Sequence, residues 1–162
     1  PDQFSGLSIG LSNCRPTSRG EITLKSADPF EHPRIVANAY STDTDVAEML
    51  AAVKVLRRIS AEDPIRSLIA EELRPGPTAQ SDDDLIADFR ARSGTVYHPS
   101  CTVRMGRDAA TSVVDPDLRV RGVEGLRVCD ASVFPTLIGG NTNAPSILVG
   151  WIGAERILKN AR

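Results

Sequence analysis

The sequence is poor in the residues that mark several classes of protein. Aromatic residues make up 4% of its 162 residues, and the formal net charge is -2. A chain with so few aromatic side chains and no excess of positive charge lacks the stacking surface and the basic field that nucleic-acid binding needs. No apolar run approaches the roughly 20 residues of a membrane helix. We therefore expect neither a nucleic-acid partner nor a membrane span.

Cysteine is scarce as well. Cys14, Cys101 and Cys129 are odd in number, widely spaced and form no CxxC pair. Neither a disulfide framework nor a zinc site is predicted, and a reducing, cytoplasmic location is the default expectation. We expect the thiols to be buried and inert, the commoner state of cysteine. The chain starts at Pro1 with neither an initiator Met nor a signal peptide, so we expect it to be a piece of a longer protein.

The hydrophobic and charged fractions, 41% and 25%, are typical of a globular protein. The spacing of apolar residues changes near Gly94, which we take as a boundary between two structural units, 1–94 and 95–162. The predicted elements are strands at 21–26 and 34–40, helices from 43, over 64–73 and from 81, short strands at 112–115, 118–120 and 126–131, and a last helix over 143–159.

Helix ends carry recognisable capping residues. Thr42 and Asp43 are the candidates before the first long helix, and Asn143 is the candidate N-cap of the last one. Gly150 and Gly153 lie inside that last helix, where each costs roughly 1 kcal/mol relative to Ala. Close packing against the helix is therefore expected at these glycines.

The stretch Tyr97–Gly106 reads YHPSCTVRMG and contains one of only two histidines. His98 as a zinc ligand is disfavoured, because only His32 could join it and a catalytic site needs three ligands. A Cys101–His98 nucleophile is disfavoured because nothing nearby lowers the thiol pKa. An imidazole pKa near 6.5 suits acid–base catalysis, but a lone histidine is more often structural. Composition and spacing leave this choice open.

Two further stretches carry polar groups at the ends of predicted elements. Asp130 lies at the carboxyl end of the predicted strand 126–131, a position where open α/β sheets bind ligands, although an ordinary turn or cap is the commoner role for such a residue. GGNTNAP (139–145) places two glycines, Asn141 and Asn143 at the start of a helix, whose free amides suit a phosphate or a carbonyl-rich ring. A simple turn and cap is the alternative.

These features, in this order and spacing, resemble the C-terminal part of the glucose–methanol–choline (GMC) family of flavin oxidoreductases. The resemblance rests on YHPSCTVRMG, LRVRGVEGLRVCDASVFP and GNTNAP, and extends through SRGEITLKSADPFEHPRI to nearly the whole chain. It looks closest to the choline dehydrogenase-like alcohol dehydrogenases and oxidases. The implied fold is mixed α+β and α/β. Residues 1–94 would supply part of the antiparallel substrate-domain sheet with its helices, and 95–162 the histidine loop with the last strand and helix of the FAD-binding domain.

The resemblance also implies a set of site residues. The implied catalytic residues are His98, in front of the flavin ring, and Asn141, at a position that the family fills with His or Asn. The implied FAD contacts are the main chain at Tyr97, the stretch Asp130 and Ala131 beside the phosphates and ribityl chain, and Thr142 and Asn143 against the pyrimidine side of the ring.

The implied reaction is oxidation of an alcohol CH–OH group by hydride transfer to flavin N5, with His98 as base and Asn141 bonded to the reacting oxygen. The sequence contains no GxGxxG, the unit that holds the FAD pyrophosphate in the family. We therefore expect the N-terminal FAD-binding portion of the same protein, or a second chain, as a partner, and this chain alone to be inactive. The alternatives are a non-redox, hydroxynitrile lyase-like member and a non-catalytic FAD-binding fragment.

Overall fold

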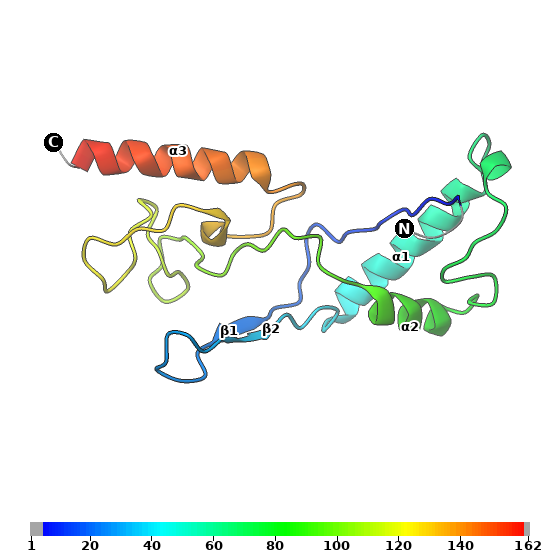
Figure 1. The fold of residues 1–162 in the computed structure, drawn as a ribbon, viewed down its shortest axis with the longest axis horizontal. Coiled ribbons are helices and arrows are strands. Elements are labelled where there is room, and N and C mark those ends of the chain that lie inside the picture. The colour runs from blue at the N-terminus through cyan, green and yellow to red at the C-terminus, as the bar shows by residue number, and fades with distance from the viewer. Residues whose placement is uncertain (1–4, 161–162) are drawn as a thin grey trace. The chain divides into compact units, whose positions relative to one another are not determined.

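The structure, a computed structural model, describes residues 5–160 and consists of two units (Figure 1). The first unit contains the described residues up to 13, Thr17–Arg19 and Asn38–Gly94. The second contains Cys14–Pro16, Gly20–Ala37 and the described residues from Thr95 onward. No helix in the described range is long and apolar enough to cross a bilayer.

The first unit is a pair of packed helices. Helix α1 (Asp43–Ser60) starts at the N-cap Thr42, and helix α2 (Asp82–Arg92) starts at Ser81, which forms a capping box with Asp84. Both helices are thus confirmed at the predicted starts. They contact each other through an apolar core of Met49, Leu85 and Phe89, with the Tyr40 ring 5.0 Å from that of Phe89.

The helix predicted over 64–73 is wrong: only a 3-10 turn, η1 (Arg66–Leu68), forms there. Leu68 is 78% exposed and Leu73 53% exposed, and Ile65 and Ile69 are only half-buried, so this segment packs no fully buried apolar face. A short helix without a packed face does not overcome the free-energy cost of nucleation.

Asp45 of α1 binds Thr17 and Ser18, which lie far from it in the sequence. Its carboxylate, 2% exposed, accepts hydrogen bonds from the Thr17 amide (2.7 Å), the Thr17 hydroxyl (2.8 Å) and the Ser18 amide (2.8 Å). Burial alone raises the pKa of Asp45, but the hydrogen bonds from Ser18 and Thr17 outweigh it and hold that pKa well below its usual range. The carboxylate is therefore ionised in the folded unit at neutral pH.

The second unit contains strands β1 (Glu21–Thr23) and β2 (Arg34–Val36), an antiparallel pair in which Ile22 lies opposite Ile35. The predicted pairing is confirmed, although both strands are shorter than expected. Ile22 and Ile35 are 51% and 68% exposed, so the described chain covers neither side of this apolar pair completely.

The strands predicted at 112–115, 118–120 and 126–131 are wrong as continuous strands. Isolated bridges form instead, joining Met105 to Val114, Val114 to Val120 and Arg119 to Arg127. Turns interrupt the pairing every few residues, with positive φ at Leu118, Gly122 and Gly125. The core of the unit comprises the buried residues Val114, Leu118 and Val133, with Val103, Met105, Val120, Val128, Cys129 and Val149 packed against them.

Helix α3 (Asn143–Asn160) closes this core from one side and contacts η2, a 3-10 turn over Ala131–Val133. Its N-cap is Thr142 rather than the predicted Asn143, because the Thr142 carbonyl already accepts from the Ser146 amide (3.0 Å). A Cβ at Gly153 would lie 2.5 Å from Cys129 Sγ, which confirms the predicted close packing there. At Gly150 the nearest atom would be 3.9 Å away, an ordinary contact.

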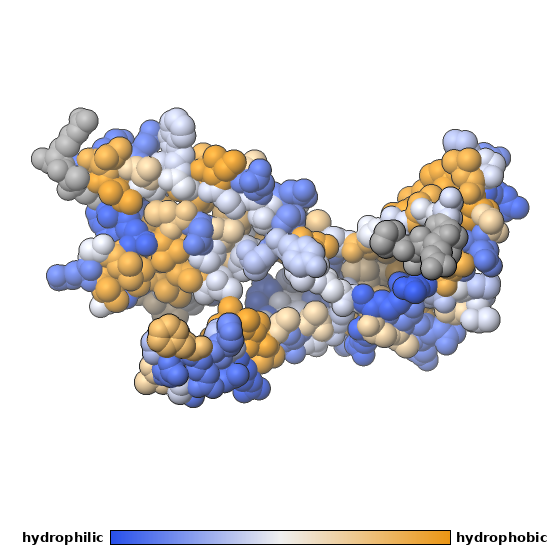
Figure 2. Space-filling view, viewed as in Figure 1, coloured by the Kyte–Doolittle hydropathy of each residue, from blue (hydrophilic) through white to orange (hydrophobic). Residues whose placement is uncertain are grey.

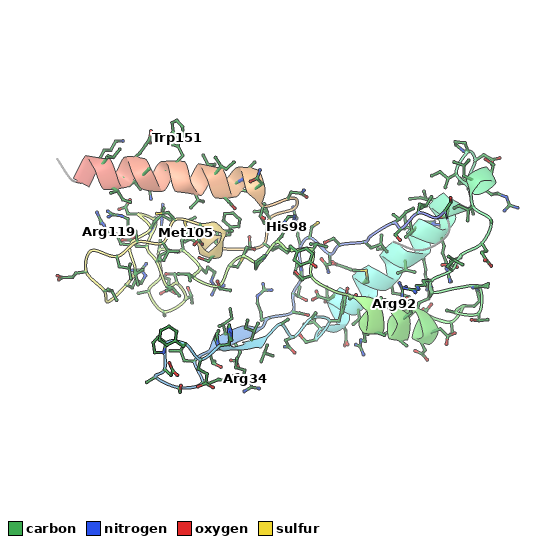
Figure 3. All side chains as sticks on the ribbon, in the orientation of Figure 1. Arg34, Arg92, His98, Met105, Arg119 and Trp151 are labelled. Carbon is green, nitrogen blue, oxygen red and sulfur yellow. The ribbon has the colours of Figure 1, made fainter. Side chains whose placement is uncertain are left out.

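The opposite face of α3 also carries apolar residues, on either side of Glu155, whose carboxylate accepts from Trp151 Nε1 (3.2 Å). Ile147, Leu148, Trp151 and Leu158 share one side of the helix, because 100° per residue places them within about 100° of one another. They are 57–68% exposed. Trp151 projects away from the rest of its unit (Figure 3), and hydrophobic residues alternate with hydrophilic ones along the outer edge of this helix (Figure 2). We call these four residues the outer face of α3.

Candidate active site

A ladder of main-chain hydrogen bonds joins the histidine loop to the turn η2. The amides of Cys101, Val103 and Met105 donate to the carbonyls of Ala131 (3.2 Å), Ser132 (2.9 Å) and Val133 (2.9 Å). Val133 is fully buried, so the ladder anchors the loop to the core of the second unit. His98 lies on the loop that leads into this ladder (Figure 3). The structure thus brings together two of the three stretches that the sequence singles out.

The His98 ring is half-buried and is held by its own neighbour. Its Nδ1 lies 3.1 Å from the Tyr97 carbonyl oxygen. Because a carbonyl oxygen only accepts, Nδ1 carries the proton and Nε2 carries the lone pair when the ring is neutral. This arrangement leaves Nε2 able to accept a proton from a ligand.

Cys101 is half-buried, and its Sγ lies 3.4 Å from the Ser100 hydroxyl rather than on His98. The prediction of buried cysteines is wrong for Cys14, which is exposed. Across residues 5–160 no group of three or more potential metal ligands is found.

Asp130 acts locally as the N-cap of η2. Its exposed carboxylate accepts from the Ser132 amide (2.8 Å) and from the Ser132 hydroxyl. The main chain of Ala131, which follows, lies beside Cys101 in the ladder. The side chain of Asp130 therefore shapes the turn whose carbonyls hold the histidine loop.

The third stretch lies at the start of α3. Gly139 and Gly140 have no positive φ, and a Cβ added at either would meet no atom within 4 Å, so nothing in the described chain requires glycine there. Glycine at such positions lets another molecule approach the backbone closely. Thr142 is 9% exposed, whereas Asn141 and Asn143 are exposed. Within residues 5–160 no hydrogen bond joins Asn141 to His98.

Sequence reasoning missed the ladder residues Val103, Met105, Ser132 and Val133. Their contribution is made by main-chain amides and carbonyls, which any residue type except proline supplies in full. Only their apolar side chains, which enter the core, leave a trace in the sequence.

Comparison with known proteins identifies relatives along nearly the whole chain. The family model described as GMC oxidoreductase matches residues 16–150. "Alcohol dehydrogenase [acceptor]" of Pseudomonas putida is 44% identical over 154 residues, which are 95% of this chain and 28% of that protein. "Choline dehydrogenase, mitochondrial" of Homo sapiens is 42% identical over 158 residues, covering 97% of this chain and 27% of that protein.

A solved structure agrees with these relatives. The FAD-dependent oxidoreductase from Chaetomium thermophilum superimposes with a TM-score of 0.85 at 27% identity, covering 92% of this chain and 26% of that one. The chain therefore spans little more than a quarter of the length of the proteins that it matches.

Proposed function

The chain belongs to the GMC oxidoreductase family, and from this membership we propose that it forms the C-terminal, active-site part of an FAD-dependent enzyme that oxidises the CH–OH group of a small alcohol. The observation that carries the proposal is the Nδ1-bonded ring of His98 on a loop fixed to the core by three main-chain hydrogen bonds. Relatives named for alcohol and for choline suggest the first substrates to test.

In the proposed reaction His98 Nε2 takes the hydroxyl proton of the alcohol, because Nδ1 is already occupied by the Tyr97 carbonyl. The exposed amide of Asn141 donates to the alcohol oxygen as negative charge develops on it. FAD, when bound, would supply the acceptor for the hydride.

The residues present fit such a cofactor. Open space beside Gly139 and Gly140 admits a ring close to the backbone, and the first turn of α3 leaves its amides without intrahelical acceptors. We assign the cofactor contacts to Tyr97, Asp130 and Ala131, and to Thr142 and Asn143.

We further propose that the remaining FAD contacts come from polypeptide outside these 162 residues, either the N-terminal portion of the same protein or a second chain. The surface area supports this. The chain exposes 12320 Å², whereas two separate compact units of half its mass would expose about 9,500 Å² in total. A standard protein–protein interface hides about 800 Å² on each partner. The area that the chain exposes beyond the total for two compact units is several times larger than the area hidden in such an interface, as expected for one portion of a larger fold. A cytoplasmic location stays a prediction from the cysteines.

Rapid-reaction spectroscopy of the full-length protein tests the catalytic proposal. Flavin bleaching on anaerobic mixing with the alcohol is expected in the wild type and should slow 10²–10⁴-fold in His98→Ala, the usual contribution of a general base. His32→Ala, which removes the other histidine of this chain, is the matched control and should bleach at the wild-type rate. Slowing of less than about tenfold in His98→Ala would exclude the base. No bleaching with any alcohol would favour the non-redox, lyase-like alternative.

A further inference from the structure

The exposed carboxylate of Asp130 uses only one of its two oxygens within the described chain. Oδ1 accepts two hydrogen bonds from the same residue, one from the Ser132 amide (2.8 Å) and one from the Ser132 hydroxyl. Among residues 5–160 no donor is bonded to Oδ2. Both oxygens of an ionised carboxylate accept hydrogen bonds. The second oxygen of Asp130 is therefore left to a donor from outside the described chain.

Ser132 makes two separate connections in this turn. Its hydroxyl and amide hold the Asp130 carboxylate, whereas its carbonyl accepts from the Val103 amide (2.9 Å) in the ladder that anchors the histidine loop. A change of the Ser132 side chain removes the hydroxyl and leaves the carbonyl in place. The hold on Asp130 can therefore be weakened separately from the ladder.

Two donors on one oxygen restrict the rotation of the Asp130 side chain. A ligand that has to order a mobile side chain loses binding free energy in doing so, whereas a side chain already fixed within the protein costs the ligand less. The hydrogen bonds from Ser132 do this ordering in advance. A donor that approaches Oδ2 therefore meets an acceptor in a defined position.

The charge and the position of Asp130 select the kind of donor. An ionised carboxylate repels a phosphate and accepts from a hydroxyl. The carbonyl of the next residue, Ala131, accepts from the Cys101 amide (3.2 Å), so Asp130 lies beside the loop that carries the base. The part of FAD that bears hydroxyls and is attached directly to the flavin ring is the ribityl chain.

We propose that Ser132 is a positioning residue, which holds the Asp130 carboxylate so that Oδ2 accepts from a hydroxyl of the ribityl chain. The proposal rests on the assignment of Asp130 to the cofactor site. It gives the Ser132 side chain a role in cofactor binding that is exerted through Asp130 and is separate from the role of the Ser132 carbonyl in the ladder.

Release of FAD from the full-length holoenzyme tests the proposal. Release is followed by flavin fluorescence after dilution, at a temperature where the wild type loses FAD over hours. Ser132→Ala should release FAD about three- to tenfold faster, the effect of one lost hydrogen bond. Ser132→Thr keeps a hydroxyl and should release FAD at the wild-type rate.

Thr111→Ala is the matched control. It removes a hydroxyl that donates to another exposed carboxylate of the same unit, that of Asp108 (3.2 Å), and should leave the release rate unchanged. A double-mutant cycle then links Ser132 to Asp130. Asp130→Ala should itself accelerate release, and adding Ser132→Ala should have no further effect, because the hydroxyl then has no carboxylate to hold.

Additive effects of Asp130→Ala and Ser132→Ala would overturn the proposal. So would wild-type release from Ser132→Ala, or release from Thr111→Ala or Ser132→Thr as fast as from Ser132→Ala, and these comparisons decide even where Asp130→Ala does not fold. None of these measurements depends on alcohol oxidation. A full-length protein that holds no FAD would reject the proposed function as well, whereas equal retention by wild type and Ser132→Ala would reject the positioning alone.

Discussion

Replacing Gly153 with Ala tests whether α3 is seated on the core as the structure describes. The new methyl group would lie 2.5 Å from Cys129 Sγ, 2.9 Å from Cys129 Cβ and 3.5 Å from Leu118 Cδ1. The first two separations are far inside van der Waals contact, so the helix or Cys129 must move. Gly150→Ala is the matched control, because its methyl group would meet only the Cys129 carbonyl oxygen, at 3.9 Å.

The two substitutions should act with opposite signs. An Ala stabilises a helix interior by about 1 kcal/mol relative to Gly, and Gly150→Ala should gain this in full. Gly153→Ala gains the same amount but also overpacks the core, which costs about 1–3 kcal/mol. The expected net effect of Gly153→Ala is therefore a loss of up to about 2 kcal/mol in the free energy of opening α3.

Hydrogen exchange of α3 peptides in the full-length protein measures this free energy locally. Exchange should slow about fivefold in Gly150→Ala and accelerate, by up to about 30-fold, in Gly153→Ala. Adding Cys129→Ala removes the sulfur and should restore part of the protection to Gly153→Ala. Equal stabilisation by both alanines would refute the packing of Gly153 on Cys129.

Three other changes have defined outcomes. Asp45→Asn should destabilise the first unit by about 2 kcal/mol, since the hydrogen bonds from Thr17 lose their charged acceptor. Because the folded pKa of Asp45 is lowered, this difference is complete well above the ordinary value of 3.8 and shrinks as the pH falls below it, so urea unfolding should show a smaller difference at pH 3 than at pH 7. Arg57→Lys should increase proteolysis of the segment after Glu72, because Lys cannot replace the two-pronged contact that Arg57 makes with that carboxylate (3.1 and 3.0 Å). Cys101→Ala should still show anaerobic flavin bleaching. Absence of bleaching in this variant would support the thiol as a nucleophile.

The helices were predictable because their signals are local. Thr42 and Ser81 are the N-caps of α1 and α2 in the structure, at the starts that the sequence predicts. The helical spacing of apolar residues in the following turns then predicts that each helix continues. The segment 112–131 was not predictable in this way. Its apolar residues alternate as in strands. The length over which they form main-chain pairs, however, depends on the turns at Leu118 and Gly122, which the folded chain shows and the alternation does not.

The candidate site shows the same division between side chain and main chain. Family strings point to His98, Asn141 and Asp130, because these positions are defined by residue type. The hydrogen bonds that hold the histidine loop leave no such pattern, since amides and carbonyls are common to all residues. The left-handed conformation of Tyr97 is equally invisible, because the residue that favours it, glycine, is not the one present.

Helix α3 connects the incomplete fold to the incomplete site. A helix that carries large apolar residues on both faces is normally covered on both, yet only the face carrying Gly153 packs within the described chain. The same helix begins at Thr142, beside the open space at Gly139 and Gly140. Polypeptide that covered the outer face would therefore also fix the helix whose first turn offers amides to a cofactor.

Trp151→Glu, in the middle of the outer face, should then weaken FAD retention by the full-length protein without touching any residue assigned to the cofactor. The reason is that a carboxylate buried against apolar polypeptide is costly unless it is paired, so the covering polypeptide would be displaced from α3. Lys159→Glu, an exposed change two turns further along the same helix, introduces the same side chain at the margin of this face, where the native side chain is already charged, and is the control. FAD retained equally by both variants would contradict the coupling between the outer face and the cofactor site.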